Sequence, residues 1–309
     1  QEVQIGLSFE SFVIERWMRE RDVFVSAAKE LGAEVNVQNA NGDVEEQISQ
    51  IEYFIKKQVD VIVVVAGDCE ALSDVMIKAR EAGIKTVSYD RLIMNAGCDL
   101  YISFDNTEVG RLMAESMLEN IPDGGDIFLI QGPLTDNNVS LIREGIDETL
   151  AGSNLNVVYE ANCPGWIAEN AYTYTKEGLK LDRNVKGIIC GNDDLASQAF
   201  RALSEERLAG KVCVTGQDGD LAACQRIVEE TQEMTAFKSV EQEASMAAKC
   251  AVLLGLGEEI EEARGTAYDG TYNVPYLELQ PIAVTKENMD EVIIKGGFHA
   301  KEDVYLNVN

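Results

Sequence analysis

The sequence has a single histidine and no closely spaced cysteine pair, and both scarcities narrow the chemistry that it can perform. His299, near the C-terminus, is the one histidine of the sequence, so a Ser-His or Cys-His nucleophile system could use no other residue as its histidine. The seven cysteines are scattered without a Cys-x-x-Cys pair, which leaves zinc and redox motifs unsupported. Neither a Gly-x-Ser-x-Gly motif nor a phosphate-binding glycine loop occurs. We therefore expect no catalytic residue, no metal site and no cofactor.

Basic residues are also few, since 26 lysines and arginines stand against 54 aspartates and glutamates, a formal net charge of −28. Nucleic acids and anionic membranes both favour a basic face, so neither is an expected partner. No hydrophobic run reaches the roughly 18 residues of a membrane-spanning helix, and we expect no insertion of this segment into a membrane. The chain starts at Gln1 without an initiator methionine or a signal peptide, and we interpret it as a mature or trimmed form.

Two distant stretches end a β-strand in the same way. Residues 86–91 and 212–218 each follow a unit of strand, helix and turn, and they deliver Asp90 and Asp218 at the strand end. At 309 residues, two domains are the natural expectation. Ligands of open α/β sheets bind at the carboxyl ends of the strands, so the repeated unit predicts a ligand cleft between two similar lobes.

Apolar runs alternate with helical patterns along most of the chain, which favours parallel sheets with helices on both faces. The predicted strands are 3–9, 34–38, 60–66, 85–89, 100–104, 126–131, 156–160, 185–190, 211–215 and 234–237. The predicted helices are 15–31, 43–57, 70–82, 107–120, 137–150, 168–181, 194–205, 221–229 and 242–256. We expect residues 266–309 to be irregular apart from strands at 274–279 and 282–284.

These elements predict an α/β fold of two Rossmann-like parallel-sheet lobes joined by a three-segment hinge. We expect the chain to cross between the lobes near residues 105, 238 and 268. The N-terminal lobe would then hold 1–105 and 239–268, and the C-terminal lobe 106–238 and 269–309. No linker is rich in proline or serine, which indicates short hinges.

Polar and aromatic side chains gather on the strand-to-helix side of these units, where the residues of a cleft belong. Any one of them has an ordinary alternative as a helix cap or an exposed turn residue. As a set, they indicate recognition of a polar ligand. They are Arg16, Trp17, Asp90, Arg91, Asp136, Asn138, Trp166, Asn192, Asp218 and Lys238.

The motifs around these residues resemble, in order and over nearly the whole chain, the type I periplasmic sugar-binding proteins of ABC transporters, and most of all the branch that binds D-xylose. The sister group of multiple-monosaccharide-binding proteins shares several of them. The motifs are Glu-Arg-Trp at 15–17, Ser-Tyr-Asp-Arg-Leu-Ile at 88–93, Asp-Asn-Asn at 136–138, Gly-Gln-Asp at 216–218 and Lys-Gly-Gly-Phe-His at 295–299.

The resemblance implies a hinged protein that closes on one monosaccharide, D-xylose first, and performs no chemistry on it. Carried over by position, Trp17 and Trp166 resemble the family's stacking aromatics. The residues that resemble its hydroxyl contacts are Arg16, Asp90, Arg91, Asp136, Asn138, Asn192, Asp218 and Lys238. Three of these are cations and three are acids, a balance that suits a neutral polyol because each hydroxyl both donates and accepts hydrogen bonds.

The resemblance also implies an extracytoplasmic protein, periplasmic or anchored as a cell-surface lipoprotein, and a monomer when not docked. Its closed form would be bound by an ABC permease or by the extracellular domain of a sensor histidine kinase. Nothing in the sequence distinguishes these two partners. A multiple-monosaccharide binder of the glucose/arabinose type is an alternative. A sugar-responsive regulator would need a helix-turn-helix ahead of residue 1. A glycosidase or sugar isomerase, the weakest rival, would turn over xylosides or xylose.

Overall fold

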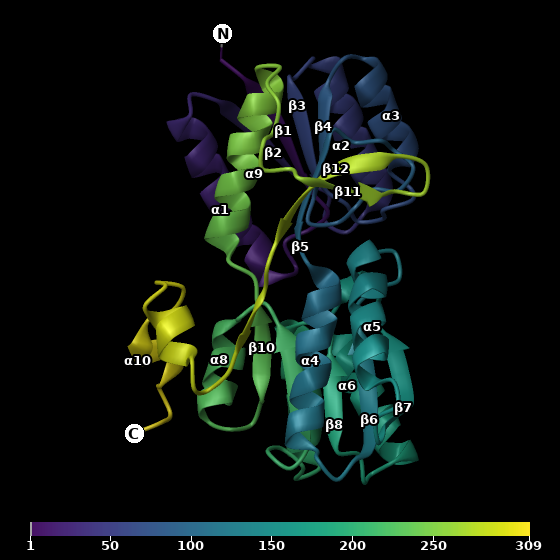
Figure 1. Ribbon diagram of the computed structural model, residues 1–309, viewed down its shortest axis with the longest axis vertical. Helices are drawn as coiled ribbons and strands as arrows, with labels where there is room; N and C mark the ends of the chain where they lie inside the picture. The colour runs from purple at the N-terminus through teal and green to yellow at the C-terminus, as the bar shows by residue number, and fades with distance from the viewer. Residues whose placement is uncertain (1) are drawn as a thin grey trace. The chain divides into compact units, whose positions relative to one another are not determined.

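The computed structural model describes residues 2–309, and the chain divides into two compact units. Unit 1 consists of Gln1–Asp105, Thr135–Asn138 and Ser239–Gln280; unit 2 consists of Asn106–Leu134, Val139–Lys238 and Pro281–Asn309. Each unit is built on one sheet of mostly parallel strands with helices on both faces (Figure 1). The predicted α/β class is confirmed.

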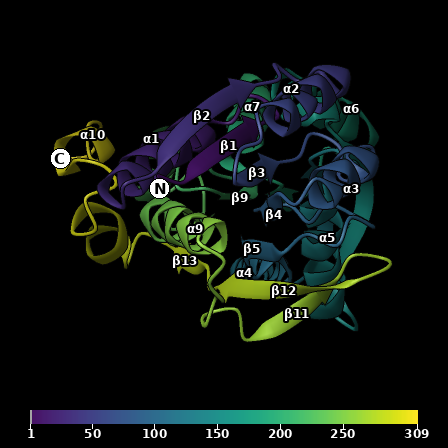
Figure 2. The same cartoon turned by 90° about the horizontal axis from the view of Figure 1, so that it is seen from above.

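Unit 1 has a seven-stranded sheet in the order β11-β12-β5-β4-β3-β1-β2; β12 runs parallel to β5, and among the described strands of this sheet only the edge strand β11 runs antiparallel to its neighbour. Helices α1 and α9 pack together on one face, and α2 and α3 cover the other (Figure 2). The strands are β1 (Gln4–Phe9), β2 (Glu34–Asn39), β3 (Val61–Val65), β4 (Lys85–Tyr89), β5 (Leu100–Phe104), β11 (Gly265–Tyr268) and β12 (Asn273–Leu279). The helices are α1 (Glu15–Glu30), α2 (Val44–Lys56), α3 (Ser73–Glu81) and α9 (Val240–Gly255).

Unit 2 has a six-stranded sheet in the order β13-β10-β9-β8-β6-β7, in which only β13 runs antiparallel to its neighbour. Helices α4 and α5 share one apolar cluster with the sheet, and α6, α7 and α8 lie on the other face. The strands are β6 (Gly125–Gln131), β7 (Leu155–Asn162), β8 (Gly187–Cys190), β9 (Cys213–Gln217), β10 (Met234–Phe237) and β13 (Ile282–Val284). The helices are α4 (Asn106–Asn120), α5 (Asn137–Leu150), α6 (Glu169–Leu181), α7 (Asp193–Glu205) and α8 (Leu221–Val228).

The strands alternate their side chains between the two faces, and this alternation builds the cores. In β3, Ile62 and Val64 join the cluster under α2 and α3. All five β3 residues are fully buried, as the uniformly apolar run of that strand predicts. In β6, Ile127 and Leu129 pack under α4 and α5, while Phe128 faces Gly178 of α6.

The C-terminal stretch departs from the prediction of irregular structure over 266–309. It contains β11, a π-helical turn at Asp290–Ile294 and the short helix α10 (Lys301–Val304). Strand β11 is largely exposed and exists because it pairs with β12, so its own sequence carries no burial pattern.

The division into units also differs from the predicted lobes in two places. Strand β12 pairs with β5 of unit 1, so the chain leaves unit 1 after Gln280 and not near residue 268. The short segment Thr135–Asn138 groups with unit 1 although the chain on either side of it belongs to unit 2. That segment carries two of the predicted site residues.

Candidate functional site

All ten predicted site residues are buried. Each follows a strand or opens a helix at the carboxyl edge of its sheet, where sequence reasoning expected it. Buried charges require partners, because an unpaired one is costly to remove from water. Unit 1 contains Arg16, Trp17, Asp90, Arg91, Asp136 and Asn138, and unit 2 contains Trp166, Asn192, Asp218 and Lys238.

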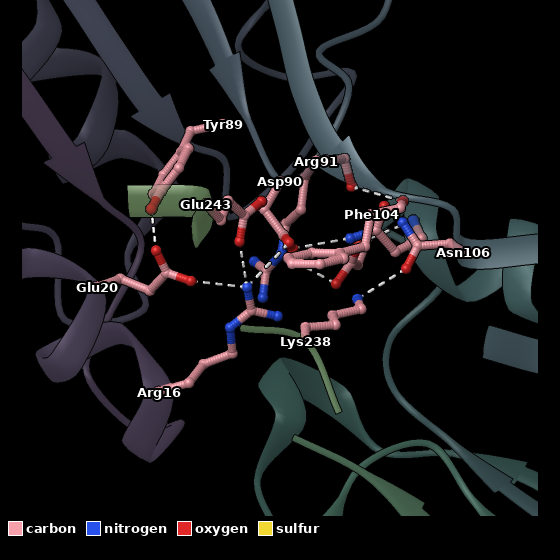
Figure 3. A network of polar contacts seen from close by, with 12 residues as sticks. Arg16, Glu20, Tyr89, Asp90, Arg91, Phe104, Asn106, Lys238 and Glu243 are labelled. Carbon is pink, nitrogen blue, oxygen red and sulfur yellow. Dashed lines mark hydrogen bonds and ion pairs between the residues drawn. The ribbon is translucent and has the colours of Figure 1, made fainter. Parts of the chain in front are cut away.

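Arg16 lies in the first turn of α1 with its guanidinium group surrounded by carboxylates (Figure 3). Its Nη2 atom lies 3.3 Å from Asp90 Oδ1, 2.9 Å from Glu20 Oε1 and 2.5 Å from Glu243 Oε2. Glu20 stands one turn further along α1, and Glu243 comes from the first turn of α9, which packs on α1. Three acids around one cation leave an excess of negative charge.

A proton on one of the two glutamates would reduce that excess from two negative charges to one. Glu20 and Glu243 are fully buried, and burial raises the pKa of Glu20 and takes the pKa of Glu243 well above its ordinary value. Glu20 accepts hydrogen bonds from Arg16 and from the Tyr89 hydroxyl. Glu243 Oε1 has no hydrogen-bond partner among residues 2–309. We place the proton on Glu243, because the carboxylate with fewer donors keeps its proton to higher pH.

Arg91, two residues after the end of β4, has its own pair of acids. Its Nη1 lies 2.9 Å from Glu10 Oε1 and donates to the carbonyl of Ala66 at 2.8 Å, and its Nε lies 3.0 Å from Asp136 Oδ2. Burial lowers the pKa of Arg91, but the carboxylates of Asp136 and Glu10 raise it by more. The guanidinium group therefore stays charged inside the unit.

Asp90 and Asn138 connect these clusters. Asn138 Nδ2 donates to Asp90 Oδ2 at 2.9 Å, and the Asn138 backbone N–H donates to Asp136 Oδ1 at 2.9 Å. Asp90 has a φ of 69°, a left-handed conformation that residues other than glycine rarely adopt. Its backbone N–H donates to the Ile102 carbonyl at 2.7 Å. The structure thus holds acid, amide and guanidinium groups at fixed spacings in unit 1.

The indole ring of Trp17 lies against both guanidinium groups. The centroid of the ring is 4.5 Å from Arg16 Cζ and 5.5 Å from Arg91 Cζ, and Phe9 and Tyr89 pack around it. Its Nε1 is buried and has no hydrogen-bond partner among residues 2–309. A buried donor without an acceptor is costly, and it marks Trp17 as a candidate for ligand contact.

Trp166 lies in unit 2, in the 3-10 turn Pro164–Trp166 that follows β7, with a φ of 58°. Its ring packs on the backbone that follows β6 and β8. A Cβ atom on Gly132 would lie 2.3 Å from the indole ring, and one on Gly191 would lie 3.1 Å from it. These two glycines therefore make the space in which the ring lies at the carboxyl edge of the sheet.

The other three predicted residues of unit 2 follow the ends of β8, β9 and β10 in turn. Asn192 caps α7 through Oδ1, which accepts the Leu195 N–H at 2.9 Å, and its buried Nδ2 has no partner among residues 2–309. Asp218 has a φ of 105°. Lys238 Nζ donates to Asn106 Oδ1 at 2.8 Å (Figure 3). Strand order makes these three residues neighbours along one sheet edge.

Sequence reasoning missed the residues that hold the predicted ones in place. A signal for Glu20 was present, because it follows Arg16 by four residues, the spacing at which acids and bases meet on a helix. Glu243 gave no such signal, since 227 residues separate it from Arg16 and only the packing of α9 on α1 brings them together. The residues missed are Glu10, Glu20, Tyr89, Asn106 and Glu243.

The described residues offer both hydrogen-bond donors and hydrogen-bond acceptors, and they form no metal centre. Within residues 2–309, no group of three or more His, Cys, Asp or Glu side chains is arranged to hold a metal ion. No helix in that range has the length and apolarity that a membrane crossing requires. Acids, guanidinium groups and amides in alternation suit a ligand that both donates and accepts hydrogen bonds.

Comparison with known proteins agrees with this geometry. Residues 5–259 match the family described as periplasmic binding protein domain. The chain is 44% identical to the D-xylose-binding periplasmic protein of Haemophilus influenzae and 40% identical to that of Escherichia coli, covering 99% and 98% of this chain and 93% of each relative. A carbohydrate transporter solute binding protein from Chloroflexus aurantiacus, solved in complex with D-glucose, superimposes with a TM-score of 0.89 at 25% identity over 98% of both chains. The chain therefore belongs to the periplasmic binding protein family.

Proposed function

We propose that this protein captures one monosaccharide, D-xylose first, and releases it unchanged. One observation carries the proposal: every residue that resembles a sugar contact of the family is buried at the carboxyl edge of its own sheet. The 44% identity to a D-xylose-binding periplasmic protein over 99% of the chain supports xylose as the first choice. The ten residues predicted from the sequence are the proposed contacts.

The chemistry of those ten residues supports an uncharged ligand. Their three cations and three acids balance, whereas a phosphate would favour surplus cations. The acids of unit 1 are already paired with arginines, so a hydroxyl that donates to an acid and accepts from a base fits between such groups. Asn192 Nδ2 and Trp17 Nε1 supply buried donors that lack acceptors among residues 2–309.

A titration of the purified protein against a panel of sugars tests the proposal. We expect calorimetry to give saturable one-to-one binding of D-xylose, and weaker binding of L-arabinose, D-ribose and D-glucose. A site built on hydroxyl contacts should reject 2-deoxy-D-ribose most strongly, because a missing hydroxyl strands its buried partner. Tight glucose binding without xylose binding would overturn the named ligand, and no binding of any sugar would overturn the function.

A second candidate is a receptor for several monosaccharides. It is favoured by the 0.89 TM-score to a solute binding protein that holds D-glucose. The same titration separates the two candidates, since a multiple-sugar receptor would bind D-glucose and D-xylose with affinities within about tenfold, or 1.4 kcal/mol, of each other.

The family membership also supports an extracytoplasmic location and delivery of the sugar to an ABC permease. A sensor kinase's extracellular domain is the alternative partner, and we propose that the protein is a monomer until it docks. We expect sugar-loaded protein to stimulate ATP hydrolysis by the permease in proteoliposomes. Stimulation of a sensor kinase's autophosphorylation without any effect on a permease would reverse that choice. D-Xylose and xylosides should remain chemically unchanged after incubation.

A further inference from the structure

Asp193, the first residue of α7, is a fully buried acid close enough to the predicted sugar residue Asp218 for their charges to interact. Its Oδ2 accepts hydrogen bonds from the Thr235 hydroxyl at 2.7 Å and from the Asp220 backbone N–H at 3.0 Å. Its Oδ1 accepts from Gln232 Nε2 at 3.0 Å. Three donors from separate segments therefore converge on one carboxylate, and all three are satisfied by its ionised form.

These bonds hold the turn that carries Asp218. Asp218 has a φ of 105° and Gly219 a φ of 71°, and a left-handed conformation at a residue with a side chain is strained. The three backbone N–H groups of the turn are all engaged: Asp218 donates to the Ala236 carbonyl, Gly219 to Thr235 Oγ1 at 3.0 Å and Asp220 to Asp193. Because Thr235 accepts from Gly219, its own hydroxyl proton is directed to Asp193. The Asp193 carboxylate thus completes this hydrogen-bond network by accepting from both Thr235 and Asp220.

Gly216, the glycine of the Gly-Gln-Asp motif, leaves room for the Asp193 carboxylate. A Cβ atom on Gly216 would lie 2.2 Å from Asp193 Oδ1, so only glycine lets the carboxylate lie against β9. Gln217, next in the motif, donates through Nε2 to the Gly191 carbonyl at 2.8 Å. The motif therefore combines a glycine that admits Asp193 with the aspartate that Asp193 supports.

Other charged and titratable groups face Asp193 and the turn. Arg226 of α8 donates to Gln232 Oε1 at 3.0 Å and lies 3.5 Å from the Asp193 carbonyl. The remaining groups are Asp218 and Asp220 in the turn, Cys190 at the end of β8, and Cys224 and His299, which both contact the Gly219 carbonyl. Burial, with the nearby Asp218 charge, raises the pKa of Asp193 to about 7, whereas burial takes the pKa of Cys190 far above neutrality.

We propose that Asp193 is a positioning residue for Asp218, whose ionised carboxylate keeps the turn 218–220 in the conformation that binds sugar. The inference rests on the proposed function of that site. When Asp193 takes up a proton, all of its neighbours are still donors, so the new O–H has no acceptor unless Thr235 reverses its hydroxyl. One bond of the set is then lost and the turn loosens. Sugar affinity should therefore fall as the pH drops through neutrality.

The experiment measures D-xylose affinity by calorimetry between pH 5.5 and 8.5 for three proteins. We expect the affinity of the unsubstituted protein to fall about tenfold from pH 8 to pH 6, the effect of one lost hydrogen bond. Asp193→Asn should be about tenfold weaker at pH 8 and flat across the range, since its amide puts a donor against a donor. Asp194→Asn, which removes the same charge from the same helical turn, should keep the pH profile.

His299 needs its own control, because histidine side chains also change charge between pH 5 and 8. The variant His299→Gln retains a donor for the Gly219 carbonyl, and we expect it to keep the pH dependence. If the dependence disappears in His299→Gln and persists in Asp193→Asn, the proposal is overturned. Equal affinity and pH profile for Asp193→Asn and the unsubstituted protein would overturn it as well.

Two measurements keep the test decisive. If circular dichroism shows that Asp193→Asn does not fold, Thr235→Val removes the same hydroxyl bridge, and unchanged affinity in that variant refutes the proposal. If the unsubstituted protein binds no sugar at any pH, the proposed function fails. Hydrogen exchange of the Asp220 amide in sugar-free protein then decides: faster exchange in Asp193→Asn but not in Asp194→Asn supports the positioning role, and equal exchange rejects it.

Discussion

At the scale of single residues, this protein buries charged side chains in clusters whose acids outnumber their cations. Three carboxylates approach the one guanidinium group of Arg16. A buried ion cluster is tolerable only when its geometry supplies hydrogen bonds and its charge is nearly balanced. The proton that we place on Glu243 cuts the excess around Arg16 from two negative charges to one.

Glu243→Gln tests this distribution of charge. The folded-state pKa of Glu243 lies well above the ordinary 4.5, so the group stabilises the folded protein fully below pH 4.5 and loses that contribution as the pH rises toward the folded value. The free energy of unfolding should therefore fall by up to about 1.4 kcal/mol per pH unit from this group. The neutral glutamine should remove that slope in urea unfolding between pH 5 and 8.

The matched control for this substitution is Glu241→Gln, two residues earlier on the same helix but exposed. It removes one carboxylate from α9 and should leave the pH dependence of unfolding unchanged. A Glu243→Gln protein that keeps the full slope, and is less stable at every pH, would show that Glu243 is ionised in the folded state.

At the scale of elements, the loops after the parallel strands hold the functional residues in conformations that regular elements do not use. Asp90, Trp166 and Asp218 all have left-handed backbones, and each is anchored from a neighbouring strand or turn. Such conformations occur where the surroundings over-determine them, often at binding sites. The strands form a rigid edge, and the loops that follow them set the orientation of the functional side chains.

Gly132→Ala tests how closely one of these loops is packed. The added Cβ would lie 2.3 Å from the Trp166 ring, so the indole must move. We expect a stability loss of about 1–3 kcal/mol, the usual result of overpacking, together with at least about tenfold weaker sugar binding. Gly265→Ala is the control, because nothing lies within 4 Å of its added Cβ. Unchanged sugar affinity in Gly132→Ala would remove Trp166 from the proposed site.

At the scale of the whole molecule, two units of similar design each present polar residues at the carboxyl edge of a sheet. The hinge closure that the family resemblance implies needs both of them. A sugar that contacts residues of both units shifts an equilibrium between open and closed forms by its extra affinity for the closed one. A ligand held by one unit alone would shift nothing.

Thermal unfolding with and without sugar tests that requirement. D-Xylose at 100 times its dissociation constant should stabilise the protein by about 2.7 kcal/mol. Asp90→Asn in unit 1 and Asp218→Asn in unit 2 should each remove most of the shift at the same sugar concentration, measured against the variant's own sugar-free midpoint. Asp123→Asn, an exposed substitution, should keep it. A full shift in either site variant would mean that one unit suffices.

The sequence alone determined the fold class and indicated the polar and aromatic residues of the candidate site. The alternation of apolar strands with amphipathic helices specified parallel sheets, because buried strands and covering helices leave different periodicities. Polar residues at strand ends were recognisable one by one, and all ten of them are buried at sheet edges. The exposed strand β11 escaped prediction because its pairing with β12, and no pattern of its own, creates it.

Only the tertiary structure decided how the predicted residues are held. The bond between Arg16 and Glu243 joins positions 227 residues apart, and Asp193 reads in the sequence as an ordinary acid at a helix N-terminus. Its role emerges from Gly216, Gln232 and Thr235, which meet around it in space. Local patterns report the periodicity of burial, whereas long-range hydrogen bonds and shared protons depend on which elements pack together.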